Sequence, residues 1–329
     1  MKTVIMRADA FEGIGTGHVM RCLALGQSLV RHDVKVVFIS RCDPKGLIER
    51  IIKEGFDFIS LKEEIELIKS QRPDWIVVDG VHFDETYHDF LRGCGCRVLA
   101  IDDMGSLPIY DVDIVVNQNL HAHDLHYNYP EHTRLLLGVK YVMLRNEFLS
   151  FLFKTKHISN AGKNLLITLG GIDKGNFTEK ILKSIIDVSD LDITVVLGAG
   201  NPHLERIKAM KMASRFTILQ NVTDMPALMS WADAAITSGG TTVWELAFMG
   251  VPSIVGRVAT IEDYLVGGLN KHGLFVDAGW FETTTEHDVC TLLTDLMADR
   301  DMRNQMSIKG QQTVTGSGCQ EVIKEMSLL

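Results

Sequence analysis

A histidine at the end of a glycine-rich loop is the strongest candidate for a catalytic base. His18 follows Gly15-Thr16-Gly17, where the loop enters a segment with the apolar spacing of a helix. The positive end of a helix dipole disfavours the imidazolium, so we expect a neutral ring that activates water near pH 7. Asp9, just after the first predicted strand, could orient this ring or a substrate hydroxyl. The alternatives are a His18 that caps the helix and an Asp9 that belongs to a turn.

A second glycine turn predicts a site for an anion. Ser238-Gly239-Gly240 separates an apolar strand from a short helix that starts at Thr241. The glycines let the backbone approach a ligand, and the free N–H groups and dipole of the helix favour a phosphate. Thr241 and Thr242 add hydroxyls, and Glu245, one turn further on, can accept hydrogen bonds from a ribose diol. We predict a nucleotide-diphosphate site here; the alternative is that the glycines serve tight strand–helix packing.

Other polar clusters predict chemistry less well. The histidines within residues 121–126 match no zinc-ligand spacing, so we expect a solvated loop. Asp102-Asp103 follows a strand and could hold a divalent ion or cap a helix, and Asp79 and Asp84 share this ambiguity. Gly198-Ala199-Gly200 is too short for a dinucleotide fingerprint, and the sequence has no Gly-x-Ser-x-Gly motif. We therefore predict neither a metal nor a cofactor.

Alternating strands and helices must position these residues. The segments expected to be strands are residues 4–7, 34–40, 56–61, 75–79, 97–102, 114–116, 165–169, 192–197, 216–219, 234–236 and 253–255. The segments expected to be helices are residues 20–30, 46–54, 63–71, 84–93, 177–188, 202–212, 225–231, 241–249, 286–299, 303–312 and 316–326. This rhythm predicts α/β architecture with doubly wound parallel sheets, in which ligands bind at the carboxyl ends of the strands.

The alternation stops once and then restarts. Residues 154–162 are polar and irregular, so we place a linker there. We expect an N-terminal Rossmann-like domain at residues 1–155, a second at 162–312, and a C-terminal helical segment at 313–329. The glycine loops at residues 13–18, 170–171 and 239–240 all follow strands, so we expect two domains that face each other across a cleft.

The composition limits the classes of partner. Of 329 residues, 46% are apolar and 23% charged, as in ordinary globular proteins, and the net charge is 33 − 42 = −9. An acidic chain without a basic run argues against nucleic acid and an anionic membrane surface. The sequence shows no signal peptide and no apolar run of membrane-spanning length. Six scattered cysteines then favour reduced thiols and a cytoplasmic location.

Motifs along nearly the whole chain resemble the UDP-sugar hydrolases of pseudaminic acid biosynthesis, which remove UDP from UDP-2,4-diacetamido-2,4,6-trideoxy-β-L-altropyranose. The motifs lie at residues 7–10, 14–23, 101–104, 117–120, 136–148, 168–176 and 238–245. This family is similar to the GT-B glycosyltransferases, especially the one that makes lipid II. In that architecture the C-terminal domain holds UDP and the last helix returns to the N-terminal domain. The resemblance implies this fold for the present chain.

The resemblance also implies a reaction. A UDP-linked diacetamido-trideoxy hexose would be hydrolysed at its anomeric carbon with inversion and without metal, His18 being the base. The 239–240 amides would bind the diphosphate with Thr241 and Thr242, Glu245 would bind the ribose, and residues 222–225 the uracil. Other enzymes of the sugar pathway are the expected protein partners. The expected substrate-binding residues are Asp9, Gly15, Gly17, Arg21, Gly170, Gly171, Val222, Met225, Ser238, Gly239, Gly240, Thr241, Thr242, Glu245 and Asp263.

Two departures from the family pattern leave the sugar open. Asp-His-Tyr of the family is Asp79-Gly80-Val81 here, and Glu-Asn-Gln is Glu262-Asp263-Tyr264. Both lie where the sugar should be recognised. The alternatives are a GT-B glycosyltransferase of cell-surface or spore-coat polysaccharide biosynthesis and a UDP-sugar-binding protein without activity.

Overall fold

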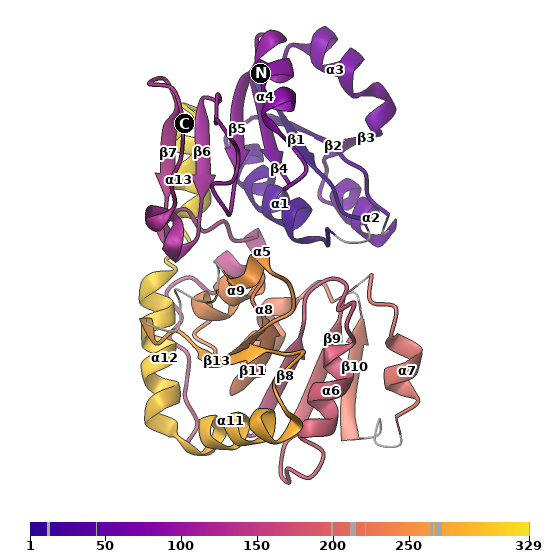
Figure 1. Ribbon diagram of the computed structural model, residues 1–329, viewed down its shortest axis with the longest axis vertical. Coiled ribbons are helices and arrows are strands. Elements are labelled where there is room, and N and C mark those ends of the chain that lie inside the picture. Colours follow the sequence, from indigo (N-terminus) through magenta and orange to yellow (C-terminus); the bar gives the residue numbers. More distant parts are fainter. Residues whose placement is uncertain are drawn as a thin grey trace. The chain divides into compact units, whose positions relative to one another are not determined.

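The chain folds into two compact units in the computed structural model (Figure 1). The first comprises Met1–Asn146 and Gly316–Leu329, and the second comprises Glu147–Thr315. The structure describes residues 1–11, 14–43, 45–198, 200–210, 215–220, 222–263, 266 and 272–328. Residues 154–162, for which the sequence predicts a linker, fall in the second unit. Gly13 and Tyr264, and the predicted helix end at residues 211–212, lie outside the described residues.

The described part of the first unit contains a parallel sheet with the strand order β3-β2-β1-β4-β5-β6-β7. Its strands are β1 (Thr3–Ala8), β2 (Lys35–Ile39), β3 (Asp57–Ile59), β4 (Trp75–Asp79), β5 (Arg97–Ile101), β6 (Ile114–Asn117) and β7 (Arg134–Leu137). The chain builds outward from β1 to β3 and then returns to add β4 on the other side of β1. The strand order therefore reverses between β1 and β4, which is where such sheets bind ligands.

Helices cover both faces of this sheet. They are α1 (Gly17–Val30), α2 (Lys45–Lys53), α3 (Glu64–Gln71), α4 (Glu85–Gly93) and α13 (Gly318–Glu325). Alternate side chains of each strand enter opposite cores, because successive residues of a strand face opposite ways. Val4 and Met6 of β1 pack with Leu23 of α1. Ile5 packs with Ile68 of α3 and Leu91 of α4.

The last helix of the chain belongs to the first unit, where it appears in yellow among indigo and magenta elements (Figure 1). Val322 and Ile323 of α13 are fully buried in the core that contains α1. Lys140 pairs with Glu321 at 2.7 Å, and Arg134 pairs with Glu325. Apolar burial and charge pairing thus hold α13 on this unit.

The described part of the second unit contains another parallel sheet, in the order β10-β9-β8-β11-β12-β13. Its strands are β8 (Asn164–Thr168), β9 (Asp192–Leu197), β10 (Phe216–Gln220), β11 (Ala234–Ser238), β12 (Ser253–Arg257) and β13 (Val276–Trp280). Its helices include α6 (Phe177–Ser184), α7 (Leu204–Lys208), α8 (Met225–Trp231), α9 (Thr242–Phe248), α11 (Glu286–Ala298) and α12 (Arg300–Thr313). Here the order reverses between β8 and β11.

The predicted doubly wound architecture is confirmed, and the structure adds strands that the sequence analysis missed. β7 and β13 extend the far edges of the two sheets. β13 contains Asp277 and a Gly279 with φ of 74°, both unusual within a strand, and its register with β12 is irregular. β7 is a four-residue strand that starts at an exposed Arg134. Neither pattern carries a strong strand signal.

We predict that Gly318→Ala destabilises the first unit. A Cβ at position 318 would collide with the Val142 carbonyl, so α13 must shift away from its core. Overpacking of this kind costs about 1–3 kcal/mol. Thermal unfolding followed by circular dichroism should show a lower midpoint. Gly46→Ala is the matched control: it is exposed in α2 with no atom within 4 Å of an added Cβ, and it should keep or slightly raise the midpoint. Equal midpoints for the two variants would contradict the assigned packing of α13.

Candidate functional site

His18 and Asp79 meet at the strand-order reversal of the first sheet. His18 is the second residue of α1, which follows β1, and Asp79 is the last residue of β4. The His18 Nδ1 and Asp79 Oδ1 atoms are 2.6 Å apart. A carboxylate at Nδ1 favours the tautomer with its proton there, which leaves the lone pair on Nε2. The pair therefore has the geometry of an oriented general base.

Arg21 fixes the carboxylate that orients His18. Arg21 lies one turn after His18 on α1. Its Nε and Nη2 donate to the two Asp79 carboxylate oxygens, both at 2.8 Å. Nη1 and Nη2 also donate to Asp103 at the end of β5, at 2.8 and 3.0 Å. Asn119 Nδ2 adds a 2.8 Å bond to Asp103. The predicted ambiguity of Asp79 and Asp103 is thus resolved in favour of a buried ion-pair network around α1.

Asp79, not the helix dipole, sets the proton affinity of His18. Burial alone would lower the His18 pKa, but the charge and hydrogen bond of Asp79 outweigh burial and raise the pKa above its ordinary value. The prediction that the helix end keeps the ring neutral was therefore wrong about the direction. A carboxylate 2.6 Å away stabilises the imidazolium more than the half-charge of a helix end destabilises it.

Asp9 does not orient His18. Its Oδ1 accepts from Arg7 at 2.5 Å and from the Arg41 amide at 2.7 Å, and its Oδ2 faces His82 Nε2 at 2.8 Å. Burial raises the Asp9 pKa, but the bonds to His82, Arg7 and Arg41 lower it to about 2. Asp9 is thus a permanent carboxylate in a separate network. Its role on a substrate hydroxyl stays a prediction.

The glycine turn of the second unit lies at the reversal between β8 and β11. Gly170, with φ of 77°, brings the end of β8 next to β11, so that an added Cβ would lie 3.9 Å from Ser238 Oγ. A Cβ on Gly239 would meet Val266 Cγ2 at 2.5 Å, whereas one on Gly240 would meet no atom of the described residues within 4 Å. The packing interpretation therefore holds for Gly239, and Gly240 leaves its backbone open to a ligand.

The backbone N–H groups of this turn also fall into two groups, one already hydrogen-bonded and one without an acceptor in the described residues. The Gly239 N–H donates to the Gly256 carbonyl at 3.1 Å, so the prediction that it binds the diphosphate was wrong. Within the described residues, no acceptor faces the N–H groups of Gly240, Thr241 and Thr242. These three amides, with the half-buried hydroxyls of Thr241 and Thr242, are the donors that remain for an anion.

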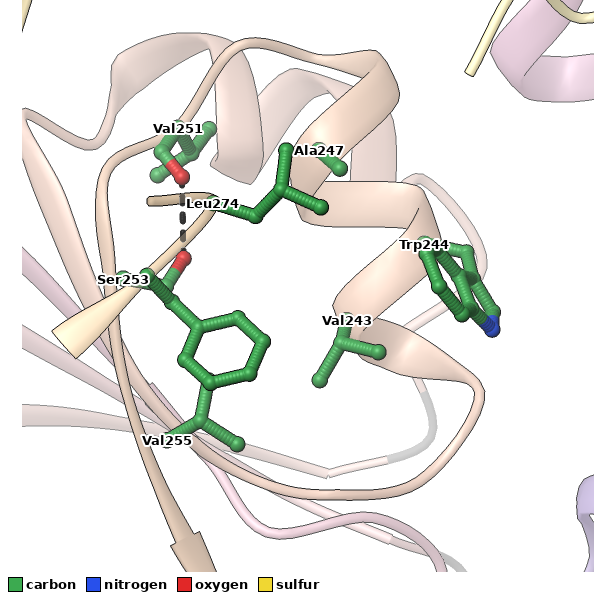
Figure 2. Close-up of a pocket in the computed structure, with 8 residues that line it drawn as sticks. Val243, Trp244, Ala247, Val251, Ser253, Val255 and Leu274 are labelled. Atoms are coloured by element: carbon green, nitrogen blue, oxygen red, sulfur yellow. Dashed lines mark hydrogen bonds between the residues drawn. The ribbon is translucent and has the colours of Figure 1, made fainter. Parts of the chain in front are cut away.

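Apolar side chains packed between α9 and β12 support the N-terminal end of α9. Val243 and Ala247 of α9 and Val255 of β12 line a pocket of about 10 Å³ (Figure 2). Ser253 Oγ in its wall donates to the Val251 carbonyl at 2.9 Å. A space of this size holds at most about one water. It is a packing void, and it leaves the N-terminal end of α9 as the ligand-binding candidate in this region.

Two other predicted binding residues of the second unit, Gly171 and Asp263, have structural partners. The Gly171 carbonyl accepts from the Gly200 amide at 3.1 Å, which joins the loops after β8 and β9. Asp263 pairs with Arg257 at 3.0 Å. Val222 is half-buried after β10, and Met225 is buried at the start of α8. Both follow β10, which β9 and β8 separate from β11 in the sheet, and α8 returns to contact β8.

Glu262 is a buried acid that the sequence analysis did not select. It accepts from the Val258 amide at 2.6 Å. Burial raises its pKa, although that bond and contacts with the Gly239 backbone and Ser238 hydroxyl act in the opposite direction. The signal in the sequence was its place in the Glu262-Asp263-Tyr264 motif. The Glu262 carboxyl thus stabilises the Ser238-Gly239 turn through its contacts with the Gly239 backbone and the Ser238 hydroxyl.

The part of the chain that the structure describes contains no cluster of three or more His, Cys, Asp or Glu side chains that could hold a metal ion. In the same residues, no helix combines the length and apolar character needed to cross a bilayer.

The known proteins to which this chain is similar carry different functional descriptions. Residues 173–256 match the glycosyltransferase family 28 C-terminal domain. The uncharacterized protein MJ1062 of Methanocaldococcus jannaschii is 29% identical over 84% of this chain, which covers only 62% of that protein. The spore coat polysaccharide biosynthesis protein SpsG of Bacillus subtilis is 23% identical, with 94% of each chain covered. The UDP-2,4-diacetamido-2,4,6-trideoxy-beta-L-altropyranose hydrolase of Campylobacter jejuni is 25% identical over 74% of this chain and 86% of its own.

Solved structures establish the fold. MurG of Acinetobacter baumannii is similar with a TM-score of 0.66 and 16% identity over 100% of both chains. MnaA of Staphylococcus aureus, solved with UDP, is similar with a TM-score of 0.69 and 13% identity, over 100% of this chain and 98% of that one. The chain has the GT-B fold, with two Rossmann-like parallel-sheet domains.

We predict that Asp79→Asn lowers the His18 pKa. The neutral amide removes the charge that stabilises the imidazolium but leaves the ring buried, so the remaining burial drives the pKa below about 6.5, the value of an unperturbed histidine. The His18 Hε1 chemical shift, followed by NMR against pH, measures this change. Asp84→Asn is the control: it changes a fully exposed carboxyl and should leave the His18 titration in place. A His18 pKa that stays elevated in Asp79→Asn would contradict the assigned pairing.

Proposed function

We propose that this protein is a nucleotide-sugar hydrolase. It releases UDP from a UDP-linked, diacetamido-trideoxy type of hexose by attack of water at the anomeric carbon, with inversion. The observation that carries the proposal is the His18–Asp79 pair at the strand-order reversal of the first sheet. The GT-B fold and the relationship to a UDP-sugar hydrolase support a nucleotide sugar as the substrate.

The first unit supplies the base. His18 Nε2 takes a proton from water while the water oxygen bonds to the anomeric carbon. The bond between that carbon and the diphosphate oxygen breaks, and its electron pair leaves with UDP. Asp79 stabilises the imidazolium that forms, and Arg21 holds Asp79 by both oxygens. The arrangement follows the logic of a base oriented by a buried carboxylate.

The second unit holds the leaving group. The Gly240, Thr241 and Thr242 amides lie at the start of α9, where they can bind the negative charge that develops on the diphosphate. Thr241 and Thr242 hydroxyls add donors. Glu245 binds the ribose, and residues 222–225 receive the uracil through backbone groups. The GT-B neighbour solved with UDP supports a nucleotide ligand for such a fold.

A glycosyltransferase is the second candidate. The family 28 match and the spore-coat polysaccharide relative support it. The same His18 would then remove a proton from an acceptor hydroxyl in place of water. The two reactions differ in whether UDP appears when no acceptor is present.

Incubation with UDP-sugars in H₂¹⁸O, without acceptor, tests the reaction class. We expect free UDP without label and a free sugar that carries ¹⁸O at its anomeric carbon, with inverted configuration. Mass spectrometry of both products and early NMR of the anomer measure this outcome. Label in UDP would show attack at phosphorus, and UDP release only after an acceptor is added would establish transfer.

We predict that His18→Asn slows UDP release by about 10²–10⁴-fold, the usual contribution of a general base. UDP affinity, measured by calorimetry, should stay within a few fold. Because the His18 pKa is raised in the free protein, wild-type kcat/KM should increase with pH through a midpoint above about 6.5. His32→Asn, in the turn after α1, is the matched control and should keep full activity. Turnover that survives in His18→Asn would exclude His18 as the base.

Gly240→Ala is expected to weaken UDP binding without loss of stability. A Cβ at position 240 meets no atom of the described residues within 4 Å and would enter the space assigned to the diphosphate. We expect Kd for UDP to rise about tenfold, equivalent to about 1.4 kcal/mol, with an unchanged unfolding midpoint. Calorimetry measures the affinity, with Gly46→Ala as the control. An unchanged Kd would place the nucleotide elsewhere.

A further inference from the structure

A second histidine shares a small pocket with His18. The pocket lies at the carboxyl ends of β4 and β5, on the α4 side of the sheet. Its wall combines apolar side chains with two histidines and the carboxylates of Asp102 and Asp103, which are hydrogen-bonded to neighbouring groups. The apolar part includes Val78, Ala100, Met104 and Leu107, and the histidines are His18 and His88. Gly80 and Val81, where the sequence departs from the resembled family, also line it.

His88 has unused hydrogen-bonding capacity in this pocket. It lies on α4 and is 3% exposed. Its Nδ1 has no hydrogen-bond partner within the described residues. Burial lowers its pKa, although the charges of Asp84, Asp89, Glu85 and Asp102 oppose this. A neutral imidazole offers one donor and one acceptor, and a buried polar atom without a partner favours a ligand that supplies one.

The space suits a small group with a polar and an apolar part. About 30 Å³ is open to the centres of water-sized spheres. Since one water needs about 10–15 Å³ by this measure, the pocket takes about two waters or a substituent with a few heavy atoms. Val78, Ala100, Met104 and Leu107 would contact a methyl group. His88 Nδ1 would pair with the polar atom beside it.

We propose that this pocket binds a short acylamino substituent of the sugar, with His88 hydrogen-bonded to its amide. The proposal rests on the proposed function, because it takes a UDP-sugar as the ligand. The shared lining by His18 places the bound substituent next to the base. His88 is thereby a specificity-determining residue, while His18 carries out the chemistry.

Two matched substrate pairs test the pocket. UDP-N-acetylglucosamine is compared with UDP-glucose, and UDP-2,4-diacetamido-2,4,6-trideoxyhexose with its 4-amino form. In at least one pair we expect kcat/KM to favour the acylated sugar about tenfold or more. His88→Leu removes the polar partner, and Ala100→Val fills the space. Both variants should bring that ratio close to one, because they lower kcat/KM for the acylated sugar more than for the non-acylated sugar.

Val98→Ile controls for added bulk. Val98 lies two residues before Ala100 on β5 in the same core and does not line the pocket, so this variant should keep the wild-type ratio. No preference in either wild-type pair, or a preference that persists in both pocket variants, overturns the proposal. If no UDP is released at all, the proposed hydrolysis has failed. The pocket is then tested by binding: Kd is measured for both sugars of each pair in the wild type and in the two pocket variants. Equal affinities of the wild type for the acylated and the non-acylated sugar would overturn the proposal.

Discussion

The buried guanidinium of Arg21 is the interaction on which the site of the first unit depends. Asp79 ends β4 and Asp103 lies two residues beyond the end of the neighbouring β5, so the two carboxylates would repel each other at the carboxyl ends of these strands. Arg21 lies on α1 and bonds to both, which joins the helix to β4 and β5. Removing one partner from such a buried network typically costs about 3–5 kcal/mol, because the remaining charge stays buried. The orientation of His18 is a consequence of this network, since its partner oxygen belongs to a carboxylate that cannot turn.

The two units use the same topological position in different chemical ways. In each sheet the candidate residues lie where the strand order reverses, and a crevice forms there because successive crossovers leave in opposite directions. The first unit fills this position with charged side chains around Arg21. The second leaves backbone amides at Gly240 and Thr241 and uses Gly239 for close packing. An imidazole base needs a polarising carboxylate, whereas a diphosphate needs donors without a competing negative charge.

Much of the fold could be predicted from the sequence, because strands buried on both faces read as continuous apolar runs. The loop before His18 was identified for the same local reason: glycines stand between a strand and a helix. The partner of His18 could not be identified, because Asp79 is 61 residues away and reaches it only through the pairing of β1 with β4. The His18 pKa was misjudged for the same reason, since a local dipole argument omits a charge from another strand. Likewise, the Gly239 N–H donates to Gly256 of β12, which lies outside the glycine motif, so the motif alone could not show that this N–H is already hydrogen-bonded.

The raised pKa of His18 does not distinguish hydrolysis from transfer. A stronger base is a better proton acceptor, but a smaller fraction of it is unprotonated near neutral pH. Water and a sugar hydroxyl lose their protons with similar difficulty, so the base itself serves either reaction. What decides is which oxygen reaches Nε2. Water needs no binding surface, whereas transfer requires an acceptor site that also keeps water from the anomeric carbon. Hydrolysis would therefore need only an oriented base and a nucleotide site, which are the two elements of the proposal above.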